Sequence, residues 1–110
     1  MLLSSDIWVY ALIRRAELAG AFATILRKGD ARGGAVLVKT LDRRTGVCRL
    51  WSEAVGHVGE PVWMHPLPGD SEVEVDAYLV RAARIDPDIW IVEIEDRDGG
   101  RFLTEEVDGR

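Results

Sequence analysis

The sequence predicts an α+β fold: a single domain with a mostly antiparallel sheet of four to six strands and two helices. Residues 89–96 combine β-branched and aromatic side chains that suit a pleated strand. Asp98-Gly99, directly after them, is typical of a hairpin turn. Ser71 and Glu74 have the spacing of a capping box at the start of a helix. Short apolar runs divided by glycine and proline fill the rest of the chain, as expected of strands and helices that pack in layers.

Length and composition indicate one globular domain over residues 1–110, with a tail after Leu103 that we expect to fray. No apolar run approaches the ~20 residues needed to span a bilayer, and the amino terminus lacks the basic segment of a signal peptide. The single cysteine, Cys48, cannot form an internal disulfide, which agrees with a reducing compartment. We therefore expect a cytoplasmic protein with no membrane partner.

The charges are divided unevenly along the chain. Residues 1–50 hold nine Lys and Arg against four Asp and Glu, whereas residues 51–110 hold five against fifteen. The simplest interpretation is that the two halves face each other within one fold or across a dimer. Acidic strands would repel a phosphate backbone, so nucleic-acid binding is disfavoured.

The first element has two interpretations. Residues 7–13 are continuously apolar, and a run of that length fits a strand or a buried helix. A helix over residues 7–19 is favoured, because residues 11–19 are nearly all strong helix formers. The Ser-Ser-Asp sequence at residues 4–6 supplies good N-caps, and Gly20 supplies a good residue to follow the last turn.

Three strands are expected in the next part of the chain, over residues 22–27, 35–41 and 47–51. The middle one is apolar on both faces, so it should be central in the sheet. Residues 42–46 form a turn cluster that joins the last two strands into a hairpin. Residues 52–60 then read as a loop.

The remaining strands are shorter. Pro61 and Pro66 bracket residues 62–65, which we expect to form an edge strand because proline cannot donate to a central ladder. Residues 101–103 should return from the Asp98-Gly99 turn as a short partner of the strand at 89–96.

The helix over residues 71–85 has one apolar face, which should pack on the sheet. That face consists of Val75, Tyr78, Leu79, Ala82 and Ala83. We expect it to meet Trp90, Val92 and Ile94, which share one face of their strand. Glu93 and Glu95 lie on the other face of that strand, which we expect to be solvated.

The sequence contains no recognisable set of catalytic or metal-binding residues. Cys48 lies in a predicted strand, where a lone cysteine is usually a small buried hydrophobe. His57 and His65 lie in or beside loops, at a spacing that matches no metal site. The acidic stretch from residue 96 departs from the calcium-loop template, because Arg101 stands where glycine is required. We therefore expect no catalytic residue, no metal and no cofactor.

One basic cluster remains as a candidate binding site: Arg14, Arg15, Lys28 and Asp30. If these residues converge, the cations could hold an anionic ligand while Asp30 orients a basic group or acts as a base. Dispersed surface charge is the simpler interpretation. The four tryptophans are many for this length; most should be core, and any exposed one would mark a partner surface.

Several segments resemble a known family. They include Trp8-Val9, Lys28-Gly29-Asp30, residues 34–39, Glu74-Val75-Asp76 and, most specifically, the sequence Asp-Pro-Asp-Ile-Trp-Ile-Val-Glu-Ile-Glu-Asp-Arg at residues 86–97. These segments are similar to domain of unknown function family 1491, a family of small bacterial proteins that are chiefly proteobacterial. The resemblance covers residues 6–103. It implies a compact cytoplasmic bacterial protein and assigns no catalytic residue.

The sequence thus favours a small non-enzymatic binding or adaptor protein that self-associates, as a homodimer. The missing catalytic constellation, the charge asymmetry and the supply of aromatic residues motivate this hypothesis. The alternative is a small enzyme or anion-binding domain that uses the basic cluster. Under either hypothesis, the partner of this protein would be an unknown protein or a small anionic ligand.

Overall fold

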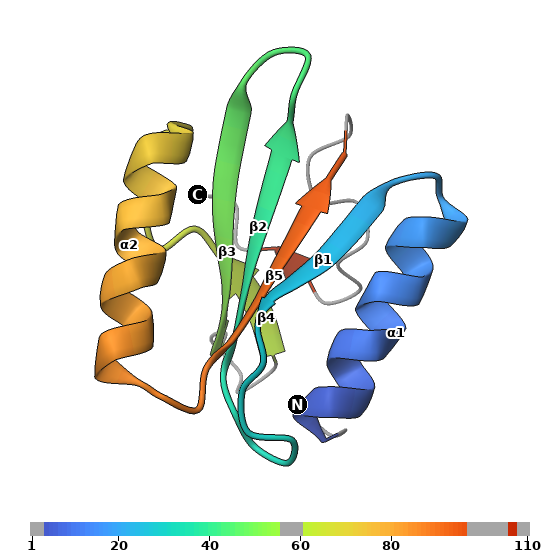
Figure 1. Ribbon diagram of the computed structural model, residues 1–110, viewed down its shortest axis with the longest axis vertical. Helices are drawn as coiled ribbons and strands as arrows, with labels where there is room; N and C mark the ends of the chain where they lie inside the picture. Colours follow the sequence, from blue (N-terminus) through green and yellow to red (C-terminus); the bar gives the residue numbers. More distant parts are fainter. Residues whose placement is uncertain (1–3, 56–60, 97–105, 108–110) are drawn as a thin grey trace.

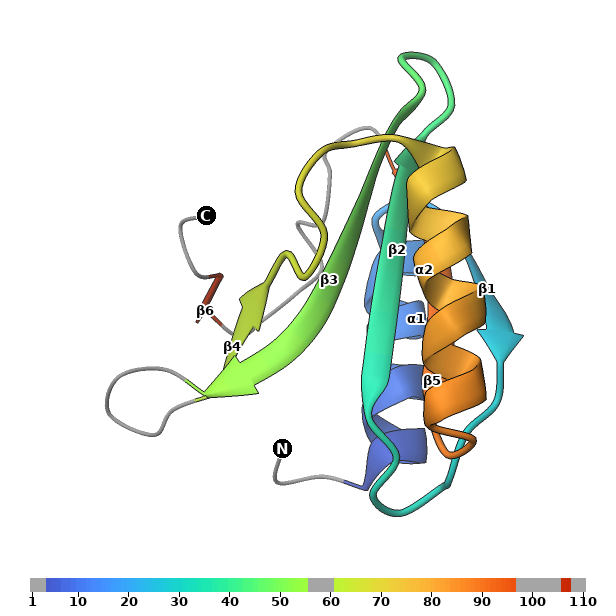
Figure 2. The same ribbon diagram turned by 90° about the vertical axis from the view of Figure 1, so that its left-hand side faces the viewer.

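A helix covers each face of one sheet in this protein. The computed structural model describes residues 4–55, 61–96 and 106–107 (Figure 1). The elements in chain order are α1 (Ser5–Leu18), β1 (Phe22–Arg27), β2 (Val36–Asp42), β3 (Val47–Val55), β4 (Pro61–Met64), α2 (Glu72–Ile85), β5 (Trp90–Glu95) and β6 (Glu106–Val107). Figure 2 shows α2 in front of the sheet and α1 behind it. The predicted α+β class with two helices is confirmed.

The sheet has six strands in the order β1-β5-β2-β3-β4-β6. β5 pairs antiparallel with β1 and parallel with β2, whereas β2, β3 and β4 form an antiparallel meander. β6 pairs parallel with β4. Because β2 lies inside the sheet with a helix on each side, residues 36–41 are all buried. The prediction of a central strand here is confirmed.

The helical interpretation of the first element is confirmed. Ser4 is the N-cap, but its hydroxyl donates to the Asp6 carboxylate (2.6 Å) instead of capping a backbone amide. The amides of Ser5 and Asp6 donate to the carbonyls of Arg32 (3.1 Å) and Ala31 (2.9 Å). The loop after β1 therefore satisfies the first turn of α1, which ties the helix to the sheet.

The two faces of the sheet have separate cores. The core under α1 contains Trp8, Val9, Leu12, Ala16, Val36, Val38, Trp51, Trp63, Trp90, Val92 and Ile94. The core under α2 contains Leu37, Leu41, Cys48, Leu50, Val75, Leu79, Ile89 and Ile91. The expectation that Trp90, Val92 and Ile94 meet the capped helix is therefore wrong, because α1 covers that face. Strand alternation shows which side chains share a face, but it does not show which helix covers them.

Some element boundaries also differ from the prediction. β3 continues to Val55, because the residues expected to form a loop pair with β4. β4 is not at the edge, since Glu106–Val107, in the tail expected to fray, pair with it as β6. The expected hairpin partner at residues 101–103 lies outside the described residues.

The capping box and the β2–β3 turn behave as their sequences predict. The Ser71 hydroxyl accepts a hydrogen bond from the Glu74 amide (3.5 Å) at the start of α2. In the turn, the Gly46 amide donates to the Asp42 carbonyl (2.7 Å), and Gly46 has a φ of 77°, which favours glycine. Neither helix in the described parts of the chain has the length and apolar character needed to cross a membrane.

Two loops meet at the Asp88 carbonyl. The Asp30 amide donates to this carbonyl (2.9 Å), and the Trp90 indole donates to the Asp30 carbonyl (2.7 Å). A Cβ atom added at Gly29 or Gly34 would overlap the Asp88 carbonyl oxygen. Glycine is required at both positions because the two backbones touch there.

We expect Gly34→Ala to lower the free energy of unfolding by about 1–3 kcal/mol, since the added methyl group must push the two loops apart. Gly33→Ala is the matched control, because a Cβ atom at Gly33 would meet nothing within 4 Å. Urea unfolding followed by tryptophan fluorescence measures both. Equal stability of the two variants would contradict the close approach.

Candidate functional site

The side chain of a buried lysine, Lys39 of β2, lies between the sheet and α2. The sequence patterns did not identify this residue as part of a site. The Lys39 side chain is 3% exposed, and its Nζ lies 2.8 Å from Glu72 Oε2, 2.7 Å from Asp76 Oδ1 and 3.2 Å from Glu93 Oε2. Glu72 and Asp76 stand one turn apart on α2, so both reach the same point. We call these four residues the lysine cluster.

The lysine cluster holds its ammonium in the charged state. Burial by itself lowers the pKa of Lys39, but hydrogen bonds to Asp76, Glu72 and Glu93 outweigh it and raise the pKa above its usual range. A lysine must lose its proton to act as a base or nucleophile, so Lys39 is unsuited to either role at neutral pH. Three carboxylates and one ammonium leave the cluster with an excess of two negative charges.

The expectation of a solvated acidic face on β5 needs correction. Glu93 is only 17% exposed, because α2 covers this face and Lys39 binds the carboxylate. Two signals in the sequence point to this arrangement. Lys39 interrupts an apolar strand, and Glu72 and Asp76 are spaced one helical turn apart.

Cys48 lies in the same core and is fully buried. Burial raises the pKa of its thiol to about 11, and the nearby Lys39 ammonium opposes this shift only in part. Cys48 is therefore protonated at neutral pH, and a protonated thiol is a weak nucleophile. The prediction of a small buried hydrophobe is confirmed.

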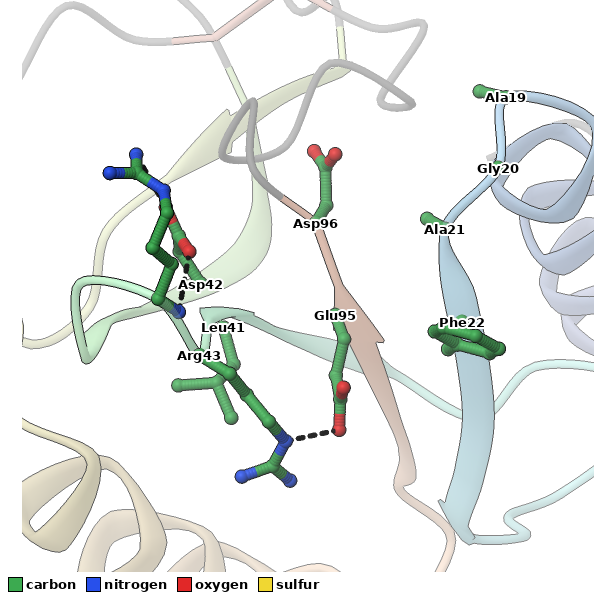
Figure 3. Close-up of a pocket in the computed structure, with 10 residues that line it drawn as sticks. Ala19, Gly20, Ala21, Phe22, Leu41, Asp42, Arg43, Glu95 and Asp96 are labelled. Carbon is green, nitrogen blue, oxygen red and sulfur yellow. Dashed lines mark hydrogen bonds and ion pairs between the residues drawn. The ribbon is translucent and has the colours of Figure 1, made fainter.

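A cleft of about 490 Å³ lies where β2 and β5 end and β1 begins (Figure 3). Its lining residues are Ala19, Gly20, Ala21, Phe22, Leu41, Asp42, Arg43, Arg44, Glu95 and Asp96. Arg43 Nε donates to Glu95 (2.7 Å), and this pair lies near the surface. Asp96 Oδ2 has no hydrogen-bond partner among the described residues. Because two arginines stand beside three carboxylates, the cleft has no strong excess of one charge to hold a ligand.

The predicted basic cluster is divided between the two ends of α1. Arg14 and Arg15 lie in its second half, whereas Lys28 and Asp30 lie in the loop that contacts its first turn. The nine steps from Ser5 to Arg14 correspond to about 13 Å along a helix axis. The Asp30 carboxylate accepts a hydrogen bond from the Gly33 amide (2.9 Å), so it shapes its own loop.

His65 and the four tryptophans belong to the packed structure. The His65 ring lies 4.1 Å from the Trp51 ring, and its Nδ1 is 3.1 Å from the Leu50 carbonyl. His57 lies outside the described residues. In the part of the chain that the structure describes, no three His, Cys, Asp or Glu side chains are grouped to hold a metal. All four tryptophans are at most 6% exposed, as expected of core residues.

The α2 side of β1 presents apolar side chains to solvent. Ala23 and Ile25 pack on the core under α1, and Phe22, Thr24 and Leu26 alternate with them. Phe22 is 75% exposed and Leu26 is 49% exposed. The core under α2 includes no residue of β1, which explains why these side chains are uncovered.

These features define a class: a small α+β protein whose sheet carries one helix on each face and whose buried lysine is paired with carboxylates from a helix and a strand. The family model described as "Protein of unknown function (DUF1491)" matches residues 3–104, and the chain belongs to this family. No curated protein matches the chain.

The solved structures that are similar to this one include the following three. The crystal structure of a DUF1491 family protein from Caulobacter crescentus has 68% sequence identity and a TM-score of 0.93, covering 97% of this chain and 100% of that one. An NMR structure of a DUF1491 family protein from the same organism has 68% identity and a TM-score of 0.89, with 99% of each chain covered. Protein Atu0922 from A. tumefaciens has 34% identity and a TM-score of 0.82, covering 100% of this chain and 99% of that one.

We expect Lys39→Met to lower the free energy of unfolding by roughly 3 kcal/mol, because it leaves the carboxylates without their shared cation. This value is at the lower end for a broken buried ion pair, since Glu72 and Asp76 are 39% and 54% exposed. Arg43→Met is the matched control and should cost much less, because it breaks an exposed pair. Denaturant unfolding at neutral pH compares the two, and equal losses would contradict a structural role for the lysine cluster.

Unfolding measured at alkaline pH should distinguish the effect of Cys48 on stability from that of Lys39. A group whose pKa is raised on folding loses its stabilising effect as the pH rises from its unfolded to its folded pKa. For Cys48 this range runs from 9.0 to about 11, whereas the effect of Lys39 is lost only above 10.5. Between pH 9 and 10.5 we expect the free energy of unfolding to fall by up to about 1.4 kcal/mol per pH unit. Cys48→Ala should remove this slope, and an unchanged slope would contradict the assignment.

Proposed function

We propose that this protein is a small non-enzymatic binding or adaptor protein that works in the cytoplasm and self-associates as a homodimer. The observation that carries the proposal is the pair of exposed apolar side chains, Phe22 and Leu26, on one face of an edge strand. Apolar side chains grouped on a surface are typical of protein–protein contacts.

The state of the interior polar groups supports a role without catalysis. Lys39 is held as an ammonium ion and Cys48 as a thiol, so neither is poised as a nucleophile. Both belong to the core under α2, where they act on stability. The free buried thiol also agrees with a reducing compartment, which supports the cytoplasm as the location.

The alternative, an enzyme or anion-binding domain built on the basic cluster, has less support. Arg14 and Arg15 lie towards the end of α1, whereas Lys28 and Asp30 lie in the loop that contacts its first turn. Asp30 is also engaged with the Gly33 amide. This division between the two ends of the helix gives less support to a single anion site.

Light scattering over a wide range of protein concentration tests the proposal. We expect the mass to rise from that of the 12.2 kDa monomer towards twice that value. Because the exposed side chains are apolar, high salt should not dissociate the dimer, whereas contacts between exposed charges would be screened. A monomer at every concentration would refute self-association.

A further inference from the structure

β1 is an edge strand whose only protection against pairing within the described residues is a bulge near its end. Among the described residues it pairs with β5 alone, and Figure 2 shows no helix or strand beyond it. Natural edges are blunted by charges, by proline or by being very short. Residues 22–26 carry neither charge nor proline, whereas the opposite edge, β6, has two residues. The one irregularity in β1 is the bulge between Ile25 and Arg27, which leaves Leu26 without a partner on β5 and ends the regular ladder at Ile25.

The exposed residues of this strand complement themselves about a two-fold axis. In an antiparallel pair, directly opposed side chains lie on the same face of the sheet. If Thr24 faces Thr24 of a second copy, then Phe22 faces the second copy's Leu26 and Leu26 faces its Phe22. All four exposed apolar side chains are then paired on the α2 side, and Ala23 meets Ile25 on the α1 side. A shift by one residue would place side chains from opposite faces against each other.

The charges along the strand favour the same occupant. Residues 22–26 carry no charge, and β1 of a second copy offers an edge strand that is equally uncharged. At the axis itself the opposed residues are uncharged threonines, so no like charges repel.

We infer that two copies of this chain join along β1 in antiparallel register, with Thr24 opposite Thr24, to form one continuous sheet. This inference rests on the proposed self-association and names its surface. Only residues 22–26 of each copy take part, so the contact belongs to the small and concentration-dependent class.

A cysteine at the axis tests the register directly. In a Cys48→Ala background, Thr24→Cys should form an intermolecular disulfide under mild oxidation, because opposed Cβ atoms lie within reach of a disulfide. Val73→Cys is the matched control, since Val73 is 80% exposed and lies on α2. Non-reducing electrophoresis should show a covalent dimer for the first variant only. Equal cross-linking of both variants would overturn the inference.

A charge at the axis provides a second readout. Thr24→Lys places two ammonium ions opposite each other and should weaken dimerisation at least about tenfold, whereas Val73→Lys should not. Mixing Thr24→Lys with Thr24→Glu should restore the dimer. If wild-type dimers form but these substitutions leave them unchanged, the β1 contact is refuted and self-association stands. If the wild type stays monomeric, both proposals are refuted.

Discussion

The parallel pairing of β2 with β5 is the constraint on which the rest of the structure depends. A parallel pair inside a sheet is buried on both faces, so it needs a helix on each side. α1 covers Val38 and Val92, and α2 covers Leu37 and Ile91. The two cores follow from this single arrangement, and the antiparallel strands extend the sheet outwards from the pair.

Lys39 brings a charge into the interior created by that pairing. Burying an ammonium ion is costly unless carboxylates and hydrogen bonds surround it. Glu72 and Asp76 come from α2 and Glu93 from β5, so the lysine cluster joins three elements. Glu72 and Asp76 reach the ammonium from adjacent turns of α2, so the lysine cluster ties this end of the helix to the sheet.

Coverage by the helices also decides what the surface offers. α2 packs over the central strands and leaves the same face of β1 open, so Phe22 and Leu26 remain in water. α1 covers the opposite face through Ala23 and Ile25. One edge strand thus combines an open edge with exposed apolar side chains, and the proposed self-association rests on this combination.

The sequence by itself determined the local elements. Ser71 caps α2, alternation separates Trp90 from Ile91, and the glycine-rich loops are recognisable, because these features depend on neighbours within a few residues. Tertiary structure decided which helix covers which face, that β4 is not an edge strand, and that Lys39 meets Glu72 and Asp76, 33 and 37 residues away. Strand order and ion pairing join distant segments, and a local pattern carries no information about which distant segments will meet.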